Sequence, residues 1–251
     1  MENKDKREII KVDHLRRNFL VGGETVKALR SVSFTIHEGE FVTIMGTSGS
    51  GKSTLLNILG CLDTPTSGDY ILDGVSVKNM SKNERAVTRN RKIGFVFQNY
   101  NLLPKTTSIE NVELPLLYNP AIKAKEREAL AIKALEAVGL KDRLYHKSNQ
   151  MSGGQQQRVA IARALVNDPV IILADEATGN LDTRTSFSIL VLFQELHARG
   201  RTIIFVTHNP DIAAYSSRNI VLRDGKVVSD TVNPSPSSAK DVLEALPIEN
   251  E

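Results

Sequence analysis

One glycine-rich segment constrains the fold of this chain more than any other feature. Residues 46–54 read Gly-Thr-Ser-Gly-Ser-Gly-Lys-Ser-Thr and fit the pattern G-x-x-x-x-G-K-[ST]. An apolar run, residues 41–45, precedes this segment, and a helical run, residues 54–59, follows it. A strand, a tight loop and a helix in this order predict a phosphate-binding loop, because glycines let backbone N–H groups turn inward around phosphate oxygens. We expect nine residues to bind a nucleoside triphosphate: Gly46, Thr47, Ser48, Gly49, Ser50, Gly51, Lys52, Ser53 and Thr54.

Two side chains at the end of this loop have separate expected roles. Lys52 neutralises the β- and γ-phosphates, and the Ser53 hydroxyl is a ligand of Mg²⁺. The motif does not say what is done with the nucleotide. The chain contains no guanine-reading Asn-Lys-x-Asp, which argues against a GTPase of the Ras type. We also find no second substrate site of the kind that a small kinase needs.

Composition narrows the class of protein. The 251 residues include 32 Lys and Arg against 29 Asp and Glu, a near balance that argues against nucleic acid as the main partner. A single cysteine, Cys61, excludes a disulfide framework and a four-cysteine zinc site. No apolar run approaches the roughly 20 residues of a membrane-spanning helix, and the N-terminus does not resemble a signal peptide. We therefore expect a soluble protein, or one that sits on a membrane through a partner.

The pattern of apolar runs predicts an α/β fold. Runs without polar alternation, typical of parallel strands buried on both faces, lie at residues 41–45, 93–97, 170–174 and 202–206. Helical patterns alternate with them at residues 125–138 and 186–198, and Pro210 after Asn209 predicts another helix start. Antiparallel strands are expected at residues 32–36 and around an Asp224-Gly225 hairpin turn. We expect a helical insertion at about residues 98–157, one domain over residues 1–232, and a linker with a loosely held acidic tail over residues 233–251.

Polar residues follow several of the predicted parallel strands. Asp175 and Glu176 end one strand, and adjacent residues on a strand point in opposite directions. Asp175 is therefore expected to bind Mg²⁺ near Ser53, while Glu176 orients or deprotonates a water that faces the γ-phosphate. His208 ends a second strand, where its imidazole could contact the γ-phosphate. Gln98 ends a third, where its amide could touch metal or water; together the strand ends predict one ligand crevice.

A second glycine-rich helix start lies 106 residues after the first glycine of the phosphate loop. Ser152 and Gln155 fit a capping box, Ser-x-x-Gln, that opens a helix. Two glycines occupy the first helical positions, although glycine costs about 0.5–1 kcal/mol in a helix. A bare first turn is expected where an anion approaches the N–H groups closely.

Taken together, these segments resemble the nucleotide-binding subunit of an ATP-binding cassette (ABC) transporter. The family likeness covers about residues 9–230 and is carried by the phosphate loop, Gln98, residues 151–165, Asp175-Glu176, residues 179–182 and His208. The resemblance implies a P-loop NTPase (RecA-like) core with a mostly parallel sheet, an antiparallel β subdomain and an inserted α-helical subdomain. It also implies an ATPase that uses ATP and Mg²⁺.

The resemblance assigns further roles. It implies that Ser152 and Gly154, in one turn with Gly153 and Gln155, contact the γ-phosphate held by a partner protomer. Asp182 would communicate between the two sites, and Phe19 would stack on adenine. The implied partners are a second copy of the chain, bound in an ATP-dependent manner, and a transmembrane permease, with no nucleic acid. The implied location is the cytoplasmic face of the inner membrane, as a peripheral subunit.

Three narrower segments resemble the branch of the family that serves macrolide export, lipoprotein release, antimicrobial-peptide resistance and cell division. They are residues 60–63 (Gly-Cys-Leu-Asp), 95–98 (Phe-Val-Phe-Gln) and 111–115 (Asn-Val-Glu-Leu-Pro). The chain departs from the family pattern in three places. Met151 stands where the family usually has leucine, a residue of similar size, and Ala177 stands where it usually has proline. Phe19 stands where the family commonly has tyrosine, so this position keeps the stacking ring but loses a hydroxyl contact.

Two other functions remain to be separated from this one. A soluble ATPase of the same superfamily could act in DNA repair, chromosome structure or translation, but the 106-residue spacing leaves no room for an inserted coiled coil, and only one cassette is present. A module that holds ATP without turnover is the third possibility, against which the presence of Glu176 and His208 argues. The sequence does not name the transported substrate.

Overall fold

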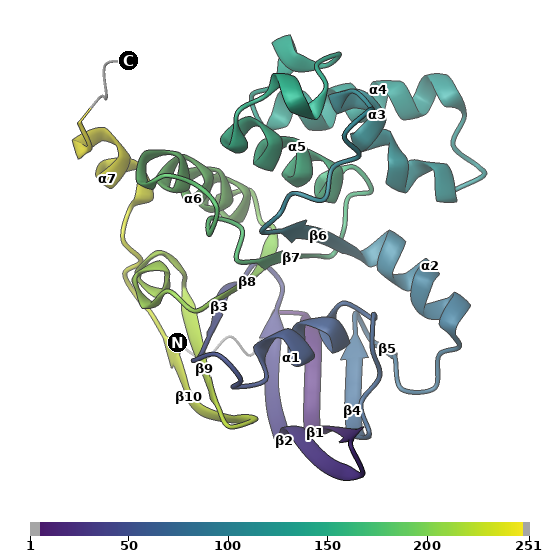
Figure 1. Cartoon of the computed structure of the whole chain (residues 1–251), viewed down its shortest axis with the longest axis vertical. Coiled ribbons are helices and arrows are strands. Elements are labelled where there is room, and N and C mark those ends of the chain that lie inside the picture. Colours follow the sequence, from purple (N-terminus) through teal and green to yellow (C-terminus); the bar gives the residue numbers. More distant parts are fainter. Residues whose placement is uncertain (1–5, 248–251) are drawn as a thin grey trace.

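The computed structural model describes residues 6–247 and contains two β-sheets with helices around them (Figure 1). The larger sheet has six strands in the order β10-β9-β3-β8-β7-β6. Five of these strands are parallel, and β10 pairs with β9 in the antiparallel direction at one edge. The strands are β3 Phe41–Met45, β6 Ile93–Phe97, β7 Ile171–Asp175, β8 Thr202–Thr207, β9 Arg218–Arg223 and β10 Lys226–Val232.

The apolar runs of the sequence are the central strands of this sheet, and their neighbours explain the lack of polar alternation. Along β8, Ile203 and Phe205 belong to one hydrophobic cluster, whereas Ile204 and Val206 belong to the other. Successive side chains of a strand point to opposite faces, so each face of this strand is covered by apolar groups. The sequence-based prediction of a sheet buried on both sides is confirmed.

The second sheet is antiparallel and has the order β2-β1-β4-β5. Its strands are β1 Glu8–Val21, β2 Glu24–His37, β4 Ser67–Leu72 and β5 Val75–Ser76. The sequence predicted only residues 32–36 within it. The long strand β1 was missed because its register shifts between Val12 and Leu15, where His14 adopts a φ of +44°. Such a bulge interrupts the polar–apolar alternation by which a strand is recognised.

The first helix after the phosphate loop, α1 Lys52–Leu59, packs between the two sheets (Figure 1). It begins two residues earlier than residues 54–59, where the sequence placed it. After α2 Lys82–Lys92 and strand β6, the chain enters a helical portion at the opposite end of the molecule from the antiparallel sheet. Its elements are α3 Ser108–Glu113, η1 Leu114–Tyr118, α4 Ala124–Ala137, η2 Lys141–Arg143, η3 Ser148–Gln150 and α5 Gly153–Leu165.

The helical portion agrees with the predicted insertion and is longer at its end. No strand lies within the described residues 98–157, and α5 continues to Leu165 because its apolar face is buried against β6. The later helix α6 Thr183–Ala198 begins three residues before the predicted residue 186, since Asp182 caps it. The helix expected after Pro210 is a 3₁₀ helix, η4 Pro210–Tyr215.

The C-terminal segment differs from the loosely held tail that its composition indicated. Residues Ala239–Ala245 form helix α7, which packs on α6, and Ala239 is fully buried. The Gln194 side chain accepts a hydrogen bond from the Ala239 amide and donates one to the Ser237 carbonyl. The Arg184 guanidinium donates to the Leu246 carbonyl at 3.0 Å. These anchors come from α6, far away in sequence, so local composition could not reveal them.

Within residues 6–247, no helix combines the length and the apolar character needed to cross a lipid bilayer.

Candidate active site

The conformation of the phosphate loop is set by its glycines and by the backbone that packs against them. It connects β3 to α1, and Gly51, at the N-cap of α1, adopts a φ of +100° and provides no capping side chain. A Cβ at Gly46 would lie 2.3 Å from the Leu222 carbonyl oxygen, and one at Gly51 would lie 2.7 Å from the Ala28 carbonyl oxygen. Backbone therefore approaches this loop too closely for any other residue type. The first N–H groups of α1 receive no side-chain cap, which suits an anion.

Lys52 closes the loop on itself. Its Nζ donates hydrogen bonds to the carbonyl oxygens of Gly46 at 2.7 Å and of Thr47 at 2.9 Å. Burial lowers the pKa of the Lys52 ammonium, an effect that the nearby carboxylates of Glu176 and Asp175 oppose. The negative charge of a phosphate next to this ammonium would stabilise its charged form and so oppose the effect of burial.

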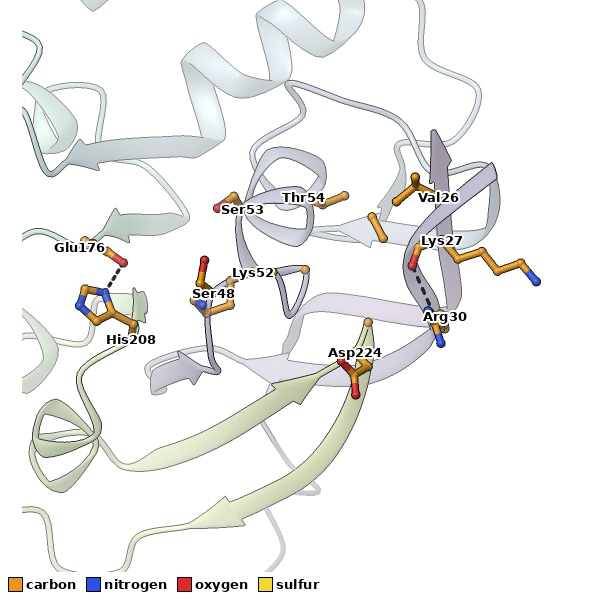
Figure 2. A pocket seen from close by; sticks show the side chains of 14 residues that line it. Val26, Lys27, Arg30, Ser48, Lys52, Ser53, Thr54, Glu176, His208 and Asp224 are labelled. Atoms are coloured by element: carbon orange, nitrogen blue, oxygen red, sulfur yellow. Dashed lines mark hydrogen bonds and ion pairs between the residues drawn. The ribbon is translucent and has the colours of Figure 1, made fainter. Parts of the chain in front are cut away.

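A cavity of about 700 Å³ opens beside the loop. Figure 2 shows Glu176 and His208 on one side of the phosphate loop, with Val26 and Lys27 of β2 on the other. The size of the cavity and the polar phosphate loop on its wall suit a small charged ligand with an organic part. Four groups of residues line the cavity: the loop and the start of α1 (Ser48, Gly49, Gly51, Lys52, Ser53 and Thr54), strand β2 (Val26, Lys27, Ala28 and Arg30), the β9–β10 turn beside β2 (Asp224 and Gly225), and the pair Glu176 and His208.

The parallel register brings the predicted strand-end residues to one level. Phe97 pairs with Asp175, Asp175 with Val206, and Met45 with Thr207. The residues that follow these strand ends, Gln98, Glu176, His208 and Gly46, therefore lie along one edge of the sheet. The carboxyl ends of parallel strands are where open α/β sheets hold ligands.

Glu176 and His208 contact each other directly. The Nδ1 atom of His208 lies 2.6 Å from Oε1 of Glu176. The sequence had predicted a separate role for each residue and no contact between them. Glu176 itself adopts a φ of +45°, a left-handed conformation that is uncommon for a residue with a side chain, and its amide donates to the Val206 carbonyl. A strained backbone thus holds this carboxylate against His208.

Asp175 lies in a setting that favours a bound cation. Burial and the neighbouring Glu176 charge raise the pKa of the Asp175 carboxyl, and Lys52 opposes this shift. Two adjacent carboxylates in a half-buried position are stabilised by a positive ion. Within residues 6–247, no cluster of three or more His, Cys, Asp or Glu side chains could hold a metal by itself. A cation here would need further oxygen ligands, such as the Ser53 hydroxyl, phosphate oxygens and water.

Gln98 is held by a residue to which the sequence assigned no role of its own. The Gln98 amide nitrogen donates to Oδ1 of Asn180 at 3.1 Å, and the Asn180 amide nitrogen donates to Oδ1 of Asn99 at 2.7 Å. A Cβ at Gly179 would lie 2.7 Å from the Gln98 amide nitrogen. The Gly-Asn pair that precedes Leu181 therefore fixes the Gln98 side chain. No local pattern in the sequence signals a contact between segments 82 residues apart.

The second glycine-rich helix start does not line the cavity. Ser152 caps α5 through the predicted capping box, with Gln155 donating its amide to the Ser152 hydroxyl and accepting from the Ser152 amide. A Cβ at Gly153 would lie 2.8 Å from the Tyr100 hydroxyl, and one at Gly154 would lie 2.5 Å from Cγ2 of Thr185. A side chain at either position would displace a neighbouring side chain, so packing within the chain also favours glycine there. Their bare first turn, expected from the approach of an anion, has this additional cause.

Asp182 and Phe19 also lie outside the cavity lining. Asp182 caps α6 by accepting the Thr185 amide at 2.8 Å, and hydrogen bonding from the Thr185 side chain and amide lowers the pKa of its carboxyl. Phe19 lies on β1 directly opposite Val26, which does line the cavity. Opposite residues of an antiparallel pair point to the same face, so the Phe19 ring lies on the same face of the sheet as Val26.

Comparisons with known proteins agree with this geometry. The family model described as "ABC transporter" matches residues 29–179, more than half of the chain. An uncharacterized ABC transporter ATP-binding protein of Thermotoga maritima is 58% identical over 207 residues, which cover 82% of this chain and 88% of that protein. The macrolide export ATP-binding/permease protein MacB of Chlorobium phaeobacteroides is 53% identical over 216 residues. That alignment covers 86% of this chain but only 33% of MacB, so the chain spans about a third of this relative.

Among solved structures, a dimer of the ATP-binding cassette MJ0796, in a post-hydrolysis state bound to ADP and Pi, superimposes with a TM-score of 0.81. The two chains are 45% identical, and the match covers 89% of this chain and 98% of that one.

Proposed function

Because this chain belongs to the ABC transporter family and is one of its ATPases, we propose that it works as an ATP- and Mg²⁺-dependent homodimer that drives a separate transmembrane permease. The observation that carries the dimer is the position of the second glycine-rich helix start. Ser152, Gly153 and Gly154 are absent from the lining of the nucleotide cavity of their own chain. In the proposed dimer, this turn of one protomer completes the cavity of its partner. Two-fold symmetry then makes the contact reciprocal, so both cavities are completed in the same way. MJ0796, a close structural relative, forms a dimer.

The residues present fit a magnesium ion bound with the nucleotide. Asp175 and the Ser53 hydroxyl would hold it, with the Gln98 amide at the rim of the same site. The raised pKa of Asp175 supports this assignment, because burial leaves that carboxyl short of a positive partner. When bound, the ion would neutralise phosphate charge and orient the phosphates.

We assign the attack on the γ-phosphate to a water held by Glu176. The Glu176 carboxylate accepts a proton from this water as the water oxygen bonds to phosphorus and ADP leaves. His208 holds the carboxylate through the 2.6 Å contact and so fixes its direction. Lys52 binds the β- and γ-phosphates, and Phe19 provides a flat apolar surface for the purine.

The proposed permease partner is of the macrolide-export or lipoprotein-release type. Support comes from MacB, in which an ATP-binding segment similar to this chain is followed or preceded by other sequence that makes up about two thirds of the protein. The chain would then act at the cytoplasmic face of the inner membrane, as a peripheral subunit. Residues 1–232 would be the cassette, and residues 233–251 an appended segment.

A mixing experiment tests the composite site. One variant, Lys52→Ala, damages the phosphate loop. The other, Ser152→Asp, keeps a good helix cap but places a negative charge where the partner's γ-phosphate would approach. Aspartate at residue 152 avoids the intrachain clash with Thr185 that any side chain at Gly154 would cause.

Each variant alone should lack steady-state ATPase activity, because both sites of its homodimer are damaged. Mixing the two should restore activity, since one site of the mixed dimer carries both lesions and the other carries none. The double variant mixed with wild type should show no such gain, and Ser81→Asp, the same change at the exposed cap of α2, should leave activity unchanged. A mixture that stays inactive and forms no ATP-dependent dimer would rule out the composite site.

A further inference from the structure

The Gly-Cys-Leu-Asp segment at residues 60–63, so far without a role, makes contact with the proposed purine site. The segment follows α1 directly, and the amides of Leu62 and Asp63 donate to the carbonyl of Asn57. Asn57 lies within α1, the helix that begins at the phosphate loop. The Asp63 carboxylate is thereby fixed relative to α1. One of its oxygens accepts the Thr64 amide at 2.7 Å, and the other accepts Nε of Arg17 at 2.8 Å.

Arg17 in turn covers one face of the Phe19 ring. Its guanidinium carbon lies 4.5 Å from the ring centroid, within the range of a cation–π contact. The Arg17 side chain is 24% exposed and that of Asp63 is 28% exposed, so the pair is partly shielded from water. The other face of the ring has no aromatic or cationic neighbour among the described residues.

The ring needs such support because of its place in the fold. Phe19 lies near the tip of the β1–β2 hairpin, where the next two residues, Leu20 and Val21, are 78% and 60% exposed. Few apolar neighbours are therefore available to hold an aromatic side chain. Two more hydrogen bonds join the same strand to the loop after Asp63: the Asn18 amide donates to the Thr66 hydroxyl, and the Thr66 amide donates to the Arg16 carbonyl.

We propose that Arg17 and Asp63 are positioning residues for the nucleobase: Asp63 holds Arg17, and Arg17 holds the Phe19 ring flat against the purine at a fixed distance from the phosphate loop. This inference rests on the proposed base site at Phe19. The connection runs from α1 through Asp63 and Arg17 to the ring, so the surface that binds the base and the loop that binds the phosphates move as one unit. A ring already held in its binding orientation loses less side-chain entropy when the base stacks on it. Such a surface reads the area of a purine and not its substituents, so ADP and GDP should benefit alike.

The test compares two ligands that differ by the nucleoside: ADP, and inorganic pyrophosphate, which reaches the phosphate loop alone. Binding of each is measured by calorimetry in the presence of Mg²⁺. Phe19→Ala calibrates the base site and should weaken ADP binding about 5- to 150-fold, as expected for base–aromatic stacking, while pyrophosphate binding stays unchanged. Arg17→Met, which keeps the length of the side chain without its charge, should weaken ADP binding about two- to fivefold with no effect on pyrophosphate.

Asp63→Asn should act in the same direction as Arg17→Met, and the double variant should be no worse than the more severe single one, because both changes break one connection. Lys78→Met is the matched control, since Lys78 pairs with Asp69 on the surface of the same sheet at 3.1 Å. It should bind both ligands as wild type does. Thermal unfolding without ligand checks that the variants are folded.

The outcomes separate the two proposals. If Phe19→Ala leaves ADP binding unchanged, the base lies elsewhere, and the base site of the proposed function fails together with this inference. If Phe19→Ala weakens ADP binding but Arg17→Met does not, the base site stands and the positioning role is overturned. A loss of ADP and pyrophosphate binding by the same factor in Arg17→Met would also overturn it, because the defect would then reach the phosphate loop.

Discussion

Two helix starts in this protein look alike in sequence and differ in structure. Both α1 and α5 follow or contain closely spaced glycines, and both were expected to bind an anion. At α1 the cap is Gly51, no side chain occupies the first N–H groups, and the cavity lies in front of them. At α5 the Ser152 hydroxyl caps the helix, and its glycines pack against Tyr100 and Thr185. The first start is a binding site within one chain, and the second becomes one, in our proposal, only when another protomer approaches.

The largest effect is expected where both helix starts should act together. Glu176→Gln keeps the shape of the side chain but cannot accept a proton, so steady-state hydrolysis should fall about 10²–10⁴-fold while ATP binding is retained. ATP would then hold the two helix starts against each other in a closed dimer, visible as a larger species in gel filtration. Glu128→Gln, an exposed change on α4, is the control. Unchanged turnover would remove Glu176 from the mechanism.

An intermediate effect should separate the two kinds of glycine. Gly51→Ala should destabilise the folded protein, because a φ of +100° costs alanine about 1–2 kcal/mol and its Cβ would clash with the Ala28 backbone oxygen. No second substitution can remove a backbone oxygen, so we expect no variant to recover this loss. Gly154→Ala should raise the free energy of the folded state by about 1–3 kcal/mol through overpacking against Thr185. That loss should be recovered by adding Thr185→Ser, which deletes the obstructing Cγ2 and keeps the backbone amide that Asp182 accepts.

Urea unfolding of the three variants measures this difference. Recovery in the Gly154→Ala/Thr185→Ser pair would show that packing within the chain is the cause at α5. A pair no more stable than Gly154→Ala alone would contradict the packing explanation.

The smallest effect concerns the charge beside the first helix start. The folded-state pKa of Asp175 is raised, so this group favours the folded protein below its unfolded pKa of about 3.9, and that contribution is lost as the pH rises through the folded pKa. Asp175→Asn should therefore raise the Tm of the ligand-free protein at pH 7 by about 2 °C or less, with the gain shrinking towards pH 4. Scanning calorimetry across this pH range checks the sign; a gain that grows towards low pH would contradict it. The same variant should gain less stability from Mg²⁺ and ATP than wild type does.

The sequence was informative wherever the local pattern and the fold depend on the same residues. The buried strands, the phosphate loop and the capping box at Ser152 each lie within a few consecutive residues, so their spacing alone predicted them. The common position of Gln98, Glu176 and His208 at one edge of the sheet followed from the expected parallel pairing of their strands. The bulged strand β1 was lost because its irregular register hides its alternation.

Contacts between distant segments could not be predicted in this way. The pairs Gln98–Asn180, Arg17–Asp63 and Glu176–His208 join residues 82, 46 and 32 positions apart. In each of them the sequence showed one or both partners but gave no sign of the contact. The tail was misjudged for the same reason, since Arg184 and Gln194 hold α7 from another helix.

The lysine that closes the phosphate loop on itself has a consequence for the kinetics of nucleotide exchange. Because Lys52 joins the Gly46 and Thr47 carbonyls, hydrogen bonds within the chain itself order the loop. The entropy of ordering it is lost when the protein folds and not at the binding step. Nucleotide association then requires no slow folding of the loop, and its rate is set by encounter and charge. Differences in affinity among nucleotides, and the lifetime of ADP on the protein, are consequently governed by the dissociation rate.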